Sequence, residues 1–237
     1  TTVMRNGKIV GTVKTSETNN QELAEMMVGR ETIGGRIRNQ CEVQDIVLKI
    51  ENLSVLDSRD LLAVKEINLD LYNGEILGVA GVDGNGQEEF IEALMGLRPI
   101  IDGKIIVNGQ QIQNLSTRER RESGIAYVPS DRYKSGIAMG GMVWENIITG
   151  EYYTKPYSDG LSLNLQNIFN ISKELVEKYQ VSTPGIKVKT SNLSGGNIQR
   201  VIAGRELGME KAKVVIASQP TRGIDIAGTE SICQILL

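Results

Sequence analysis

The stretch that decides the fold is Gly81-Val82-Asp83-Gly84-Asn85-Gly86-Gln87-Glu88, which follows the apolar run Ile76-Leu77-Gly78-Val79-Ala80. The apolar run predicts a buried parallel strand, and apolar residues then recur at helical spacing between positions 90 and 95. A glycine-rich turn between a strand and a helix presents backbone N–H groups to an anion. The stretch has the spacing of the phosphate-binding loop GxxxxGK[ST], but Gln87 replaces the lysine and Glu88 the hydroxyl residue. The pattern alone is equally compatible with a tight turn that binds nothing.

The composition favours an α/β protein and argues against several other classes. The 237 residues include 26 Gly and only 2 Phe, and the formal net charge is −3. An acidic chain is atypical of a nucleic-acid-binding protein, so we expect no nucleic-acid partner. The sequence has no run approaching the roughly 18 apolar residues of a membrane span. Cys41 and Cys233 lie far apart without a ligand motif, which predicts no disulfide and no metal site, and favours a reducing cytosol.

The pattern of the chain changes near residue 46. Before it, Asn6-Gly7 predicts a hairpin, and a short helix and a polar stretch follow, which we interpret as an appendage and linker. After it, imperfect alternation up to residue 71 predicts an antiparallel β region, with a further hairpin over 102–109. Buried strands are predicted at 124–129 and 213–217, and a long helix at Asn167–Tyr179.

Two further motifs follow the glycine loop in a fixed order. Leu193-Ser194-Gly195-Gly196-Asn197 is similar to the LSGGQ signature of ABC transporter ATPases, in the LSGGN form of importers for simple sugars and nucleosides. The strand after it runs into Gln219-Pro220-Thr221-Arg222-Gly223-Ile224-Asp225, where the family carries Asp-Glu-Pro-Thr and its D-loop. The resemblance covers residues 47–237. Residues 1–46 then resemble the tail of a preceding cassette plus a linker. The chain is thus similar to the second cassette of a tandem importer ATPase, ending before the family's switch histidine.

The resemblance implies an α/β fold of the P-loop NTPase class, of the ABC ATPase type. This fold has a RecA-like core, an antiparallel β subdomain and a helical subdomain that carries the signature. Two cassettes pair head to tail, so that each ATP lies between the glycine loop of one and the signature of the other. The implied cofactors are ATP and Mg²⁺. The implied partners are the first cassette of the same polypeptide, transmembrane permease subunits and, indirectly, a solute-binding protein, at the cytoplasmic face of the cell membrane.

The half-site of the glycine loop departs from the family at several positions. Its nucleotide-binding residues would be Gly81, Gly84, Asn85, Gly86, Gln87, Glu88, Ser130 and Ser218. Ser218 stands at the aspartate that supports Mg²⁺, and Ser130 at the Gln or Glu that senses the γ-phosphate. Gln219 stands at the glutamate that polarises water, and an amide cannot act as a general base, so no catalytic residue is assigned. Glu88 is a candidate Mg²⁺ ligand, but we favour its other role, complementing the helix macrodipole.

The half-site of the signature is intact. It comprises Leu193, Ser194, Gly195, Gly196, Asn197 and Gln199, together with the D-loop acid Asp225. The Ser194 hydroxyl and the glycine amides, at a helix N-terminus, are the donors that a γ-phosphate requires. We therefore expect a degenerate cassette that binds nucleotide weakly and completes a partner's hydrolytic site. Two alternatives stay open: a hydrolytically active site in which Glu88 or Glu89 supports Mg²⁺, and an interaction module that binds no nucleotide.

Overall fold

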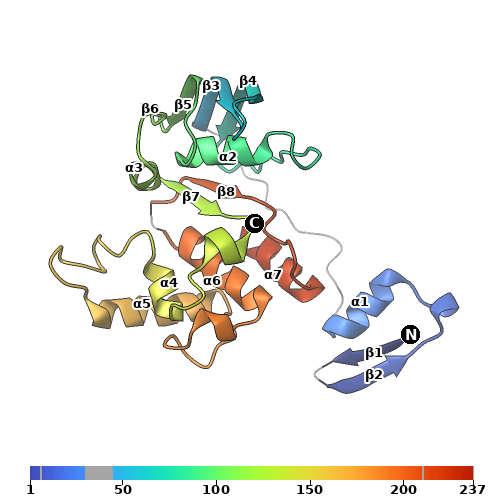
Figure 1. Cartoon of the computed structure of the whole chain (residues 1–237). Helices are drawn as coiled ribbons and strands as arrows, with labels where there is room; N and C mark the ends of the chain where they lie inside the picture. Colours follow the sequence, from blue (N-terminus) through green and yellow to red (C-terminus); the bar gives the residue numbers. More distant parts are fainter. Residues whose placement is uncertain (6, 30–44, 210, 237) are drawn as a thin grey trace.

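The computed structural model describes residues 1–5, 7–29, 45–209 and 211–236. From residue 45 onward the elements are stacked in layers, as Figure 1 shows: an antiparallel sheet, the helix α2, a parallel strand pair, and a group of helices. Two hydrophobic cores hold the layers together. The first lies around α2 and between the two sheets, and the second lies among the helices.

The antiparallel sheet has the order β4-β3-β5-β6. Its strands are β3 (Ile46–Leu56), β4 (Leu62–Tyr72), β5 (Asp102–Val107) and β6 (Gln110–Gln111). Alternate apolar residues of β3 and β5 are almost fully buried because α2 (Gln87–Met95) packs against this face. The turn Asn108-Gly109 has positive φ at both positions, as a two-residue hairpin requires. The predicted antiparallel region and hairpin are confirmed.

The parallel pair consists of β7 (Ile125–Val128) and β8 (Val214–Ala217), and α3 (Thr117–Glu122) precedes β7. The two strands pair in register from Ile125 with Val214 to Val128 with Ala217. Both strands were predicted as buried. This holds for β7, whereas in β8 only Val214 is buried and Val215 is 39% exposed.

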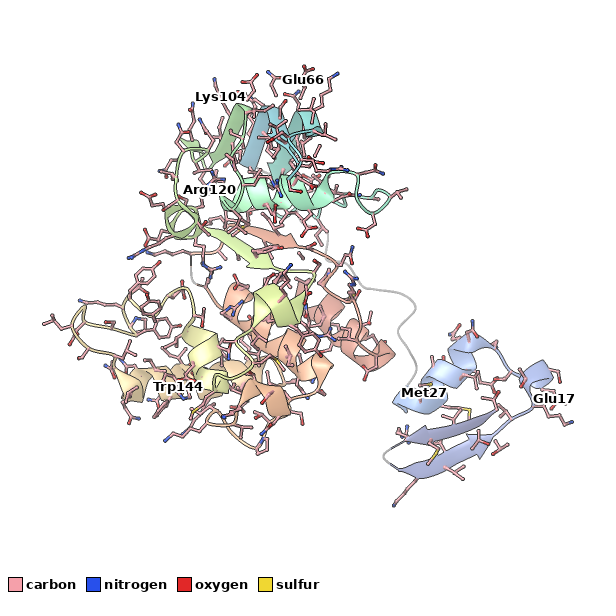
Figure 2. All side chains as sticks on the ribbon, in the orientation of Figure 1. Glu17, Met27, Glu66, Lys104, Arg120 and Trp144 are labelled. Carbon is pink, nitrogen blue, oxygen red and sulfur yellow. The ribbon has the colours of Figure 1, made fainter. Side chains whose placement is uncertain are left out.

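The helical layer lies on the other side of the parallel pair (Figure 1). It contains α4 (Val143–Ile148), α5 (Leu165–Lys178), α6 (Gly195–Leu207) and α7 (Ile226–Leu236), and α5 confirms the predicted long helix. Short helical turns occur at Arg132–Gly136 and Thr190–Asn192. Trp144 of α4 meets Phe169 of α5 edge to face, with ring centroids 5.5 Å apart, in the part of the molecule labelled in Figure 2. This layer carries the signature at the start of α6.

The N-terminal residues form a small unit of their own. The predicted hairpin is present as β1 (Thr2–Arg5) and β2 (Lys8–Thr12), and the short helical turn Thr15–Glu17 follows. Helix α1 (Asn20–Val28) begins after the N-cap Asn19 and ends at Gly29, which confirms the predicted short helix. Cys41 and most of the polar linker lie outside the described residues, and the division of the chain near residue 46 stays a prediction.

The predicted strand Ile76–Ala80 is wrong for this structure. The segment has no strand pairing, and its side chains are exposed, with Ile76 at 55%, Leu77 at 42% and Val79 at 63%. Both ends of the segment are fixed to the antiparallel sheet: Asn73 N donates to Asp45 O at 2.9 Å, and a Cβ on Gly86 would collide with Ala63 O. Gly78 within the segment further weakens a strand, because glycine loses the most conformational freedom on ordering.

Candidate functional site

The glycine loop makes a sharp turn into α2. Gly84 (φ +82°) and Gly86 (φ +91°) have left-handed backbones that favour glycine. Gly86 is the N-cap of α2, and its lack of a side chain lets the loop lie directly against the backbone of Ala63 in β4. These glycines let the chain turn sharply between residues 81 and 86 into α2, and the binding of an anion by this turn stays a prediction.

The side chain of Gln87 closes this loop on itself. Its Nε2 donates to Val82 O at 2.9 Å, and its Oε1 accepts from Asn85 N at 3.0 Å. The amide of Asn85 is one of the donors that the prediction assigned to a phosphate, and here it is already bonded. A Cβ on Gly81 would collide with Gln87 Nε2, so this position too must be glycine for the side chain to fold back. The loop is thus satisfied internally.

Glu88 and Glu89 occupy the first turn of α2, where carboxylates complement the helix macrodipole. Burial raises the pKa of the Tyr127 hydroxyl, and the negative charges of Glu88 and Glu92 raise this pKa further, which shows that α2 faces β7. In the described parts of the chain no three His, Cys, Asp or Glu residues are grouped to hold a metal ion. Glu88 thus lies where a carboxylate complements the helix macrodipole, and its part in binding Mg²⁺ stays a prediction.

Ser130 and Ser218 lie together at the carboxyl ends of β7 and β8. Ser218 N donates to Val128 O at 2.9 Å. Val128 is the last residue of β7 and precedes Ser130 by two positions, so Ser218 lies beside the end of that strand. Gln219 follows with a left-handed backbone (φ +42°) and an exposed side chain. Within the described residues, no hydrogen bond joins segment 76–86 to these positions. The structure thus brings together the strand-end residues, while the described hydrogen bonds of the glycine loop stay within the loop and α2.

The signature forms the start of α6 with Ser194 as its N-cap. The exposed side chain of Ser194 accepts from Asn197 N at 3.4 Å and from Asn197 Nδ2 at 3.0 Å, which leaves its hydroxyl hydrogen to donate. Gly195 and Gly196 form the first turn, whose amides have no acceptor within the helix. Leu193 is half-buried, and Gln199 is 3% exposed and packs inside the protein. The Ser194 hydroxyl and the two glycine amides thus lie at the start of α6, and their role as phosphate donors stays a prediction.

Asp225 of the D-loop lies at the start of α7. Its Oδ1 accepts from Gly228 N at 2.6 Å, and its carbonyl accepts from Thr229 N at 2.8 Å. The carboxylate therefore caps α7, in the manner that Ser194 caps α6. Its exposed position leaves the second carboxylate oxygen open to solvent.

Buried charges fix the far ends of both helices. Arg120, 3% exposed, donates to Ala93 O and, at 3.0 Å, to Leu94 O, and so caps the end of α2 (Figure 2). Glu206, 1% exposed, lies at the end of α6 and accepts from Arg121, Arg205 and the backbone N–H of Tyr127, at 2.7, 2.7 and 3.1 Å. These residues were missed in the sequence, because their partners lie up to 85 positions away and no local pattern marks them.

This arrangement, with an antiparallel sheet, a glycine loop leading into α2, a parallel pair and a helical layer headed by the signature, is the fold of an ABC ATPase. The chain matches the ABC transporter family model over residues 64–222, more than half of its length, and therefore belongs to that family.

Similar structures support the same fold. The ATP-binding cassette MJ0796, solved as a dimer in a post-hydrolysis state with ADP and Pi, superimposes with a TM-score of 0.66 at 21% identity, covering 80% of this chain and 81% of that one. CbiO1 from Clostridium perfringens, part of the transporter complex cbiONQ, gives 0.63 at 24% identity, covering 81% and 73%. At these identities the likeness shows the fold alone.

Sequence relatives match the whole chain. The guanosine import ATP-binding protein NupO of Bacillus subtilis is 41% identical over 236 residues, 100% of this chain and 46% of NupO. The nucleoside import ATP-binding protein NupA of Lactococcus lactis is 39% identical, and the glucose import ATP-binding protein TsgD13 of Haloferax volcanii 36%, over 46% and 43% of their lengths. The chain thus spans about half the length of these relatives. None of the described helices is long and apolar enough to cross a bilayer.

Proposed function

We propose that this chain is an ATP-binding cassette of an importer for a nucleoside or a simple sugar, and the second cassette of a tandem polypeptide. Its signature completes the ATP site of a partner cassette, while its own glycine loop binds nucleotide weakly and does not hydrolyse it rapidly. The relatives named for guanosine, nucleoside and glucose import, each about twice as long as this chain, support the importer and the tandem arrangement.

The observation that carries the proposal is the fold-back of Gln87. A triphosphate in this loop has to displace the bond from Asn85 N and receives no cation in return. A hydrogen bond to a charged group contributes about 1.5 to 3 kcal/mol, against about 0.5 to 1.5 kcal/mol for a neutral one. Replacing a lysine by Gln87 therefore weakens phosphate binding by about tenfold or more, and it removes charge stabilisation from phosphoryl transfer.

The residues of the two half-sites differ in what they can hold. The hydroxyl of Ser194 and the first-turn amides of α6 fit a phosphate group of ATP offered by a partner. At the other half-site, Ser218 and Gln219 supply no carboxylate, and within the described residues Glu88 belongs to no group of three acidic, His or Cys side chains that could hold a metal ion. This donor set does not fit Mg²⁺, which prefers carboxylate oxygens, and we assign no hydrolytic step to it.

The remaining partners follow from the importer role. We infer that the chain works with transmembrane permease subunits at the cytoplasmic face of the cell membrane, and indirectly with a solute-binding protein. The names of the import relatives support this, and the net charge of −3 is consistent with the absence of a nucleic-acid partner.

The test is the ATPase activity of the full-length protein after the lysine in the other cassette's glycine loop is replaced by alanine. We expect turnover to be lost, because the site served by Ser194 then lacks its own lysine. Substantial remaining turnover would show instead that the site of this chain hydrolyses ATP. Labelled ATP titrated onto the same variant addresses the third reading: saturation in the micromolar to millimolar range indicates a weak site, and no saturation indicates a pure interaction module.

A further inference from the structure

Arg132 reaches from the loop after β7 to the segment before α7. It lies two residues after Ser130, at the start of the helical turn Arg132–Gly136. Its Nη1 donates to Arg222 O at 2.7 Å, and its Nη2 donates to Gly223 O at 2.9 Å. The planar guanidinium thus binds two successive carbonyls of the D-loop segment, which lies about 90 residues away in the sequence.

The same guanidinium lies against the first residue of the signature helix. A Cβ on Gly195 would lie only 2.8 Å from Arg132 Nη2 and 3.2 Å from its Cζ, and a Cβ on Gly223 would lie 3.4 Å from Nη2. Gly195 therefore has a packing reason to be glycine, besides the approach of its amide to a phosphate. Arg132 lies where the γ-phosphate sensor position, the signature and the D-loop meet.

The turn that carries Arg132 is itself held in place. Asp131 Oδ1 accepts from the N–H groups of Tyr133 and Lys134 at 3.0 Å each, and these bonds lower the pKa of the Asp131 carboxyl. The guanidinium also lies over the Tyr133 ring, 4.8 Å from its centroid. The backbone of the turn is thus held by Asp131, and the guanidinium is held by the two carbonyls.

The positive charge of Arg132 is not neutralised by a carboxylate. Its acceptors are backbone carbonyls, and across the described ranges it makes no ion pair. Its Nε is buried and has no hydrogen-bond partner. The guanidinium therefore fixes the backbone at Arg222 and Gly223, and its positive charge remains beside the start of α6.

We propose that Arg132 is a positioning residue for the signature half-site. It holds the D-loop segment and the first turn of α6 in one fixed relation to the loop at Ser130. The position of the donors at Ser194–Gly196, which face a partner's nucleotide, therefore also depends on the loop of this chain that carries Ser130 and Arg132. This inference rests on the proposed function, because it requires that the signature serves a partner site.

The test is a double-variant cycle in the full-length protein, using Arg132→Lys and Ser194→Ala. Lysine keeps the charge but cannot bind both carbonyls in a planar fork, and we expect turnover to fall about tenfold. In the Ser194→Ala background the same substitution is expected to change turnover less than twofold, because the donor that it positions is already gone. Arg59→Lys is the matched control: Arg59 is also paired, with Asp57, but in a turn of the antiparallel sheet.

Each outcome decides something. Losses that multiply in the double variant overturn the role of Arg132 and leave the proposed function intact. An unchanged turnover in Ser194→Ala alone overturns the proposed function, and this role with it. A loss in Arg132→Lys that is accompanied by a lowered unfolding temperature, beyond that of Arg59→Lys, means that the residue only stabilises the fold and also overturns the inference.

Discussion

The glycine loop before α2 and the signature before α6 share one structural feature. Each is a glycine-containing turn that exposes the first amides of a helix. In the first, Gln87 folds back and bonds Asn85 N, whereas in the second, Ser194 caps the helix and stays exposed. The comparison teaches that glycines create an anion-binding shape, but the next side chain decides whether the amides remain available to a ligand.

The helices that follow the two turns are both held at their far ends by buried charged side chains. Arg120 fixes the end of α2, and Glu206 fixes the end of α6, each with its charged group bonded to several partners inside the protein. The difference between the half-sites therefore lies in a few functional groups and not in the scaffold. We expect single substitutions to move each half-site toward the other.

Removing the carboxylate of Glu206 is expected to have the largest effect, because it breaks the frame of the intact half-site. Glu206→Ala leaves the half-buried Arg121 and Arg205 without their carboxylate, and breaking a buried pair costs about 3 to 5 kcal/mol of unfolding free energy. The matched control is Glu122→Ala, which removes an exposed i,i+4 pair with Arg118 and should cost at most about 0.5 kcal/mol. Denaturant unfolding of both variants checks this, and equal losses would contradict it.

Ser194→Ala is expected to damage the intact half-site without unfolding it. Loss of one preorganised phosphate donor should lower ATP turnover of the full-length protein by about 100-fold. The lost N-cap should cost about 1 kcal/mol of stability. Ser116→Ala is the control, since Ser116 caps α3 in a capping box and lies outside both half-sites. If Ser116→Ala lowers turnover as much, stability alone explains the loss.

If the proposed function holds, Gln87→Lys should move the half-site of the glycine loop toward a working one. The lysine restores a cation and frees the amide of Asn85, and we expect the affinity for ATP to rise about tenfold. Gln87→Ala frees the amide without adding charge and should give a smaller gain. Titration with labelled ATP compares the two variants. No gain in either would place the defect at Ser218 and Gln219 instead.

The smallest expected effect is a pH dependence in the turn between β3 and β4. The N–H of Leu61 and the side chain of Arg59 lower the pKa of Asp57 from 3.8 to about 2. A depressed folded-state pKa stabilises the protein above pH 3.8, and this contribution is lost as the pH falls toward 2. The stability difference between the protein and Asp57→Asn should therefore shrink over this range. A difference that does not change with pH would contradict the assignment.

The sequence predicted most elements because their signals are local. Alternation predicted β3 and β4, Asn6-Gly7 predicted the first hairpin, and apolar spacing predicted the long helix α5. The strand Ile76–Ala80 was predicted wrongly. Its apolar composition indicates that the segment could be buried, but it does not indicate which strand would pair with it. Pairing is a long-range property, and here both ends of the segment are held by the antiparallel sheet.

The sequence by itself determined the ABC family, the order of the motifs and the exchange of lysine for Gln87, since each is carried by residue identity at fixed spacing. Only the tertiary structure decided that Gln87 bonds its own loop, that Glu206 joins α6 to β7, and that Arg132 clamps the D-loop against Gly195. Such contacts depend on how side-chain directions meet across layers, which no local pattern encodes. The glycine loop is therefore recognisable from sequence, while its closure is a property of the fold.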